Sequence, residues 1–222
     1  MSTPALVLDF GGPVLLTIFE LVELEPDTPA HALLHGRGPL AQPGSDPDWD
    51  DLQAGRITER TYWAHRSEEW HQAGGVGRDI RALVAHLFEP ARPELIRDQA
   101  RALIRDARAA GIPVSILTND MKAFHSDQWL AEMDVLREID LIVDGSVEGF
   151  LKPDPRLYQL LGERLDVALD DMVFLDDQAT NIRGAEAIGI PSVWFDVLDP
   201  DASYAQVRKL LGLEGEGDGR TA

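Results

Sequence analysis

Two short polar segments each directly follow an apolar run. Both offer groups that could bind an anion. Asp9 follows the run Ala5–Leu8 and enters a turn with two glycines, whose backbone N–H groups can approach an anion. Thr118 and Asn119 follow Val114–Leu117, and a hydroxyl group beside free N–H groups can hold an oxyanion. Taken alone, either cluster also suits an ordinary turn or a helix N-cap.

Two further clusters are charged. Lys152 precedes two prolines that stiffen a turn and begin a helix. Asp176 and Asp177 follow another apolar run, with Asn181 one helical turn beyond. Adjacent carboxylates repel each other, and a hard cation with oxygen ligands would offset that repulsion. A lone surface lysine and a helix-capping aspartate are the alternatives, but the four clusters together are far more specific than any one of them.

The elements that position these clusters alternate between strands and helices. Continuous apolar runs suit a parallel sheet that is covered on both faces. Helical patterns at Pro93–Ala110, Pro155–Leu165 and Asn181–Ile188 separate several of the runs, so the sequence predicts a doubly wound α/β fold. All four clusters then lie at the carboxyl edge of the sheet, where ligands bind in such folds. The predicted strands are Ala5–Leu8, Val114–Leu117, Leu141–Val143, Met172–Leu175 and Ser192–Phe195.

One long segment interrupts the alternation. Between the first two predicted strands we find no further buried strand, whereas Thr58 is a good helix N-cap with Ile57 and Tyr62 placed as a hydrophobic staple. Residues 39–51 are rich in Pro, Gly and Asp and predict a loop. We therefore expect a core domain of residues 1–15 and 90–211, a helical insertion of residues 16–89, and a flexible tail of residues 212–222.

Composition excludes several classes of protein. The net charge of −19 is opposite to the basic footprint that nucleic-acid binding needs, so an anionic ligand would require a local cation. The chain has no cysteine, which excludes disulfides, zinc–thiolate sites and thiol nucleophiles. Neither a signal-peptide pattern nor an apolar run of ~18 residues is evident. We expect a cytoplasmic, soluble protein without nucleic-acid or membrane partners.

The order of the clusters resembles a known family. Asp-turn, Thr-Asn, Lys-Pro and Asp-Asp-x-x-x-Asn, each at a strand end, resemble the four motifs of the haloacid dehalogenase-like hydrolases. The resemblance covers residues 5–15 and about 91–195, and the insertion lies where that superfamily has its helical cap. Residues 55–63 are also similar to the cap of one phosphatase-like branch. The resemblance implies the strand order 5-4-1-2-3, with Asp9 at the centre.

The resemblance also implies a mechanism. Asp9 would attack phosphorus and form an aspartyl-phosphate, which water then hydrolyses. Mg²⁺ would be held by Asp9, the backbone carbonyl of Gly11 and Asp177, with Asp176 close by or bridging through water. Thr118, the N–H of Asn119 and the catalytic Lys152 would bind phosphate oxygens, and Phe10 and Gly11 would line the substrate site.

Gly11 departs from the family pattern. The usual first motif is Asp-x-Asp, in which the second Asp is the general acid and base, a role worth roughly 10²–10⁴-fold in rate. Here that position is Gly11. The sequence offers histidines of the insertion as substitutes, each of which also suits a surface or packing position: His65, His31, His35 and His71.

Three functions therefore stay open. We expect a Mg²⁺-dependent phosphohydrolase for a small phosphorylated metabolite. A carbon–halogen hydrolase is the first alternative, because halide needs no protonation, although such an enzyme has no need of both Asp176 and Asp177. A regulatory protein that binds phosphate without turnover is the second, favoured by Gly11 and disfavoured by Asp9, Lys152 and Asp177. Neither the substrate nor the oligomeric state can be read from the sequence.

Overall fold

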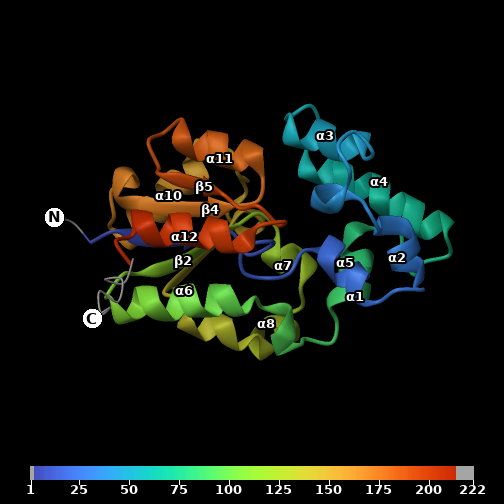
Figure 1. The fold of residues 1–222 in the computed structure, drawn as a ribbon, viewed down its shortest axis with the longest axis horizontal. Helices are drawn as coiled ribbons and strands as arrows, with labels where there is room; N and C mark the ends of the chain where they lie inside the picture. Colours follow the sequence, from blue (N-terminus) through green and yellow to red (C-terminus); the bar gives the residue numbers. More distant parts are fainter. Residues whose placement is uncertain (1–2, 214–222) are drawn as a thin grey trace, which may run out of the picture.

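Five parallel strands form the centre of the protein. In the computed structural model, which describes residues 3–213, they are ordered β3-β2-β1-β4-β5 (Figure 1). This confirms the predicted order. Most of the expected tail, residues 214–222, lies outside the described residues. The strands are β1 (Ala5–Leu8), β2 (Val114–Thr118), β3 (Leu141–Asp144), β4 (Met172–Asp176) and β5 (Ser192–Trp194).

Helices cover both faces of the sheet, because alternate side chains of each strand point to opposite sides. Leu6 and Leu8 of β1 belong to one apolar cluster, and Ala5 and Val7 to another. The first cluster contains residues of α6 and α12, and the second contains residues of α10 and α11. These helices are α6 (Asp98–Ala109), α10 (Pro155–Leu165), α11 (Ala179–Glu186) and α12 (Pro200–Leu210).

The segment between β1 and α6 contains helices, and no β-strand lies in it. Thr58 caps α4 as predicted, with its side chain accepting a hydrogen bond from the backbone of Thr61. Figure 1 shows α1–α5 gathered beyond the carboxyl ends of the strands. The α-helices are α1 (Ile18–Leu24), α2 (Pro29–Leu34), α3 (Pro47–Gln53), α4 (Glu59–Gln72) and α5 (Ile80–Phe88). We call residues 16–89 the cap; its boundaries stay a prediction.

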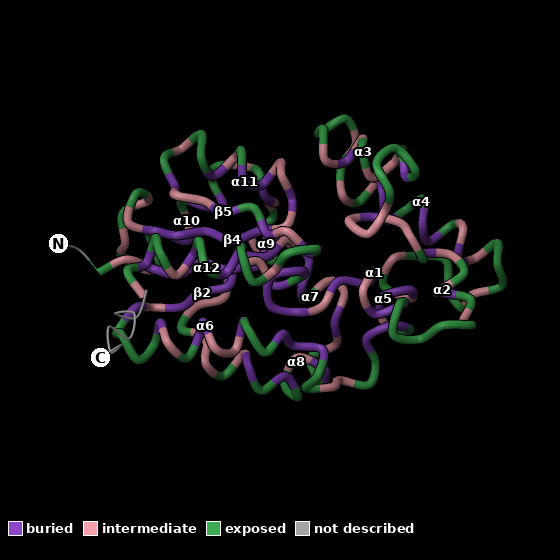
Figure 2. Tube along the Cα trace, viewed as in Figure 1, coloured by how far each residue is buried: buried purple, intermediate pink, exposed green. Residues whose placement is uncertain are grey.

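Buried residues run along the chain from the sheet into the cap (Figure 2), and one apolar cluster contains residues of both. Phe19, Tyr62 and Trp63 of the cap pack on one another, with Phe19 and Trp63 stacked at 5.5 Å between ring centroids. Phe88 at the end of α5 meets Trp129 of the core, whose indole donates to the Phe88 carbonyl at 2.9 Å. The cap therefore has a packed apolar interior that is continuous with the core.

Three predicted helix boundaries or loops were wrong. Pro93–Leu95 forms a separate 3-10 turn, and α6 begins only at Asp98, because Ile96 pairs with Leu15 in an extended bridge. The predicted helix Asn181–Ile188 lies instead at Ala179–Glu186. The predicted loop 39–51 contains the start of α3, which Asp46 caps. None of the helices formed by residues 3–213 is long and apolar enough to cross a membrane. Short helices complete the core: α7 (Met121–Phe124), α8 (Asp127–Glu132) and α9 (Gly145–Glu148).

Candidate functional site

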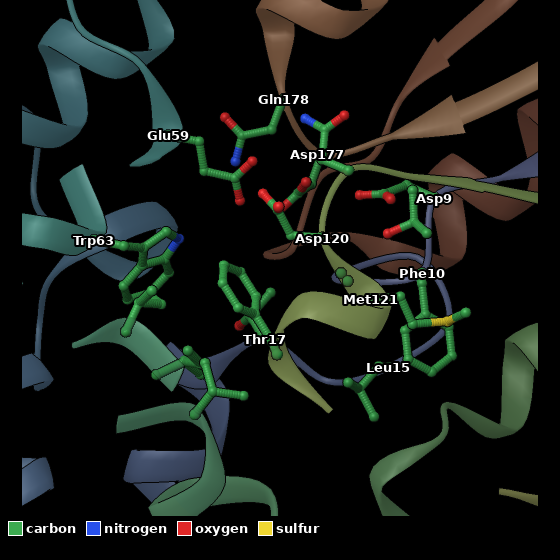
Figure 3. A pocket seen from close by; sticks show the side chains of 18 of the residues that line it. Asp9, Phe10, Leu15, Thr17, Glu59, Trp63, Asp120, Met121, Asp177 and Gln178 are labelled. Carbon is green, nitrogen blue, oxygen red and sulfur yellow. The ribbon is translucent and has the colours of Figure 1, made fainter. Parts of the chain in front are cut away.

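The four clusters meet in one cavity at the carboxyl edge of the sheet. Residues after β1, β2 and β4, together with Lys152, form its floor, and the cap forms the opposite wall (Figure 3). All the predicted site residues except Asp176 line this cavity: Asp9, Phe10, Gly11, Thr118, Asn119, Lys152 and Asp177. The parallel register explains the convergence, because Leu8 of β1 is level with Ile116 of β2 and Leu175 of β4.

Lys152 is a buried ammonium group with all three of its N–H bonds in use. Its Nζ lies 2.8 Å from Oδ1 of Asp9 and donates to Oδ2 of Asp176 at 2.7 Å and to the Leu117 carbonyl at 2.8 Å. Burial alone would lower the pKa of Lys152, but the carboxylates of Asp176 and Asp9 raise it above the usual value. Lys152 therefore stays charged.

Asp176 holds Lys152 in place. Its side chain is fully buried, and its oxygens also accept hydrogen bonds from the Gln178 backbone at 2.7 Å and from the Asn181 amide at 3.1 Å. With both oxygens occupied, Asp176 has little capacity left for a metal ion. This arrangement favours the secondary role that the sequence predicts for it.

Asp177 differs sharply from its neighbour. Within residues 3–213 no donor forms a hydrogen bond to its carboxylate, which faces the cavity. Withdrawal from solvent, and then the nearby charges of Asp176 and Asp9, raise the pKa of Asp177 well above its usual value. Burial likewise raises the pKa of Asp9 to about 7, although Lys152 opposes the rise. Carboxylate oxygens of all three lie within 4.8 Å of one another, so the cluster can hold a cation.

The turn after β1 is fixed by groups far away in the sequence. Arg97 is buried and donates from Nε to the Gly12 carbonyl at 2.6 Å, and it also pairs with Glu20 at 2.5 Å. The Tyr204 hydroxyl donates to the Pro13 carbonyl at 2.6 Å. None of these three side chains carries a signal that the sequence analysis could use.

The two glycines of this turn have different roles. Gly12 has a φ of +83°, and a Cβ there would lie 3.0 Å from the Asp177 carboxyl group, so a side chain at this position would be strained and would press on Asp177. Gly11 is outside the positive-φ range, and a Cβ there would meet nothing within 4 Å. Neither backbone conformation nor packing therefore requires glycine at position 11.

Asn119 has a role that the sequence did not predict. Its side-chain Oδ1 accepts from the Lys152 backbone N–H at 2.7 Å, and its Nδ2 donates to the Lys152 carbonyl at 3.3 Å. The amide therefore holds the loop that carries the ammonium group. Phe10 is buried against the edges of His125 and Trp129.

None of the four cap histidines lines the cavity. His65 contacts Asp48, and His31 and His35 lie beside Glu23. His71 is at the far end of α4, away from the cavity lining. The histidine that does line it is His125, which the sequence analysis passed over; burial lowers its pKa to about 4, so it is neutral at physiological pH.

Glu59 is the cap carboxyl group that enters the cavity, and the sequence analysis missed it. It is the first residue of α4, and Figure 3 shows its side chain pointing toward Asp177 and Gln178. Burial raises the pKa of Glu59, with Lys152 opposing and the charge of Asp120 adding to the rise. The signal that could have found it is Thr58, which caps the helix that Glu59 begins.

Polar contacts close the cap over the core. Arg60 of α4 donates to Asp120 of the core at 2.5 Å. The Gln53 side chain lies 3.4 Å from that of Gln178 and accepts from the Ala179 backbone at 3.2 Å. These contacts lie beside Glu59 and Asp177, so the position of the cap is tied to the site.

Comparison with known proteins agrees with this geometry. The family model "haloacid dehalogenase-like hydrolase" matches residues 4–189. The mouse protein acyl-CoA dehydrogenase family member 10 is 32% identical over 218 residues, which is 96% of this chain and 19% of the mouse protein. A phosphoserine phosphatase of Thermus thermophilus is 28% identical over 155 residues, 68% of this chain and 60% of the relative. This chain thus spans less than two thirds of either relative.

A solved dehalogenase structure shares the fold, with a TM-score of 0.58 and 24% sequence identity, covering 88% of this chain and 85% of the dehalogenase. The family model matches well over half of the chain, in the stretch that carries Asp9, Thr118, Lys152 and Asp177. The four converging motifs and this match lead to one conclusion: the chain belongs to the haloacid dehalogenase-like hydrolases.

Proposed function

We propose that this protein is a Mg²⁺-dependent phosphohydrolase in which Asp9 is the nucleophile. The proposal rests on the surroundings of Asp9. The charged Lys152 lies on one side of it, and on the other lies the Asp177 carboxylate, to which no donor among residues 3–213 forms a hydrogen bond. The negative charges of this site exceed its positive charges by one or two, and a phosphoryl group adds further negative charge. A divalent cation supplies what is missing.

The residues present fit Mg²⁺. The ion prefers oxygen ligands in near-octahedral geometry, and the carboxylates of Asp9 and Asp177 with the Gly11 carbonyl would hold it. Asp176 would act through Lys152. When bound, the ion neutralises charge on the transferring phosphoryl group and orients it.

The chain's own groups then account for both steps. The Lys152 ammonium group, 2.8 Å from Oδ1 of Asp9, holds the carboxylate of Asp9, and an oxygen of that carboxylate attacks phosphorus as the ester bond breaks. Thr118 and the Asn119 N–H would bind the phosphoryl oxygens beside the Lys152 ammonium group. In the second step water attacks the aspartyl-phosphate, releases inorganic phosphate and restores the Asp9 carboxylate.

We assign the proton transfers to Glu59. Among the titratable residues that line the cavity, Asp9 and Asp177 face the metal, Asp120 is paired with Arg60, and His125 is buried and neutral. Glu59 remains, and its raised pKa suits a carboxylic acid that gives a proton to the leaving oxygen and takes one from water. Acid–base catalysis would thus come from the cap instead of from position 11.

The test is release of inorganic phosphate from a panel that includes p-nitrophenyl phosphate and O-phosphoserine, with Mg²⁺ and with chelator. We expect phosphate only with Mg²⁺, and none from Asp9→Asn. Halide release from 2-chloropropionate without metal, and no phosphate, would show a carbon–halogen hydrolase instead. Metal-dependent binding of beryllium fluoride without any turnover would show a phosphate-binding regulatory protein.

A further inference from the structure

The part of the cavity beyond the catalytic floor is apolar. Side chains of the cap, of α7 and of the turn after β1 line it, and six of them define its character: Leu15, Ile18, Trp63, Val84, Phe88 and Phe124. Most are buried in the hydrophobic cluster that joins cap and core. A leaving group that extends from the phosphoryl site toward the cap therefore meets hydrocarbon and aromatic surfaces.

No free positive charge is available to that leaving group. Among residues 3–213, Lys152 is the only lysine or arginine that lines the cavity, and its three donors are occupied. Arg60 lies outside the lining and pairs with Asp120. His125 is neutral at physiological pH and stacks on Trp129 at 3.9 Å.

The acidic groups that face the cavity add to this selectivity. Glu59 and Asp120 both line it on the cap side of the catalytic floor. A carboxylate on the leaving group would be desolvated beside these groups without a cation to pair with, which is strongly unfavourable. Substrates with a carboxylate tail are thus disfavoured.

Two polar groups of the lining are already engaged in hydrogen bonds. The Thr17 hydroxyl donates to Glu20 at 2.7 Å and accepts from the Glu20 backbone at 3.2 Å. The Asn181 amide is bound to Asp176. A substrate hydroxyl group could use neither of them without breaking the bonds that they already form.

We propose that the substrate is a phosphate monoester of an uncharged, predominantly apolar alcohol, such as an alkyl, prenyl or arylalkyl phosphate. The proposal rests on the proposed phosphohydrolase function and deepens it. The phosphate supplies all the affinity for the charged floor, and the alcohol supplies hydrophobic burial under the cap. Each methylene group that the cavity buries is expected to raise kcat/KM by about 4-fold.

The experiment compares ethyl, butyl and hexyl phosphate with 6-phosphooxyhexanoate, using the Mg²⁺-loaded wild-type protein and phosphate release as the readout. We expect kcat/KM to rise along the alkyl series and to fall by at least about 10-fold when the terminal methyl of hexyl phosphate is replaced by carboxylate. A flat alkyl series, or equal or better turnover of the carboxylate, would overturn the proposal.

A pair of variants tests the location of this selectivity. Ile80→Lys places a cation in the cavity lining at the half-buried start of α5, whereas Val76→Lys adds the same charge at an exposed position outside it. Ile80→Lys should improve 6-phosphooxyhexanoate relative to hexyl phosphate by several-fold, and Val76→Lys should not. Equal effects of the two variants would contradict the assigned cavity.

A binding experiment with phosphonates, which cannot be hydrolysed, tests this proposal separately from the proposed function. If no phosphate ester is hydrolysed, the catalytic proposal fails, and calorimetry with hexylphosphonate and 6-phosphonohexanoate still tests the cavity. We expect hexylphosphonate to bind at least several-fold more tightly to the Mg²⁺-loaded protein. Equal affinities, or tighter binding of the carboxylate, would overturn the inference whatever the fate of the catalytic proposal.

Discussion

Two adjacent aspartates illustrate how neighbouring residues with the same side chain acquire different roles. Asp176 is buried with its oxygens satisfied by Lys152, Gln178 and Asn181, whereas the Asp177 carboxylate faces the cavity without a hydrogen-bond donor among residues 3–213. Breaking a buried ion pair costs about 3–5 kcal/mol, because the partner charge is left uncompensated. A carboxylate held for a metal instead destabilises the metal-free fold.

The first prediction concerns the thermal stability of the variants Asp177→Asn and Asp176→Asn. Because the pKa of Asp177 is raised, its contribution to the metal-free fold is present below its unfolded pKa of about 3.9 and is lost as pH rises through the folded pKa. Asp177→Asn should therefore raise Tm in chelator at pH 8 and abolish the gain in Tm that Mg²⁺ gives to the wild type. Asp176→Asn should lower Tm. Thermal melts at pH 5 and pH 8 measure both, and a full Mg²⁺-induced gain in Asp177→Asn would refute the metal assignment.

The second prediction concerns proton transfer. Glu59→Gln should slow poor leaving groups, such as alkoxides, by roughly 10²–10⁴-fold and p-nitrophenolate much less. Gly11→Asp in the same background should recover part of that loss, because position 11 has open space and no positive φ. The dependence of kcat/KM on leaving-group pKa measures both effects. A Glu59→Gln enzyme with unchanged dependence would remove Glu59 from proton transfer.

At the scale of elements, the turn between β1 and the cap shows why local sequence is insufficient. The glycines of the turn are visible in the sequence, but Arg97 and Tyr204, which hold it, come from two distant segments. The same is true of α6, whose start is displaced from Pro93 to Asp98 by the tertiary bridge between Leu15 and Ile96. Contacts across the chain, and not local propensity, set both features.

The third prediction uses two glycines with nearly the same backbone. Gly12 and Gly149 have φ values of +83° and +85°, but only at Gly12 would a Cβ meet the Asp177 carboxyl group. Alanine at either position should cost about 1 kcal/mol in backbone strain. Gly12→Ala should in addition weaken Mg²⁺ binding by displacing Asp177, whereas Gly149→Ala should leave it unchanged. Calorimetric Mg²⁺ titration distinguishes them, and equal affinities would show that Gly12 does not shape the metal site.

The parallel strands could be predicted because their apolar runs are continuous and bounded by turns. All five were found within about one residue, as was Pro155–Leu165, which starts at a proline after a capping aspartate. The start of α3 was missed because a Pro- and Asp-rich stretch suits both a loop and a capped helix start. Local composition there does not distinguish the two.

At the scale of the whole molecule, the floor of the site could be predicted from the sequence, but the opposite wall that the cap forms could not. The floor follows from strand ends in a parallel sheet, so residue type and order are sufficient to place Asp9, Lys152 and Asp177 together. Glu59, His125 and the apolar wall depend on how α4 and α5 pack over the core, which no periodicity in the cap reveals. Proton transfer and substrate selectivity both come from that packing.

The fourth prediction tests this division between cap and core. Arg60→Ala removes the ion pair to Asp120 that joins α4 to the core, whereas Arg56→Ala removes an exposed ion pair to Asp51 within the cap. Arg60→Ala should lower kcat/KM several-fold with Mg²⁺ affinity unchanged, since closure of a lid assembles the site. Arg56→Ala should change neither quantity. A loss of Mg²⁺ affinity in Arg60→Ala would show that cap and metal site are not separable.

The account depends most on a covalent bond between phosphorus and Asp9. Rapid acid quenching during turnover of a ³²P-labelled phosphate ester, followed by peptide mapping, measures this bond directly. We predict label on the peptide that contains Asp9 when Mg²⁺ is present, and none with chelator or in Asp9→Asn. Phosphate release at the wild-type rate without labelled protein, or by Asp9→Asn, would contradict the account.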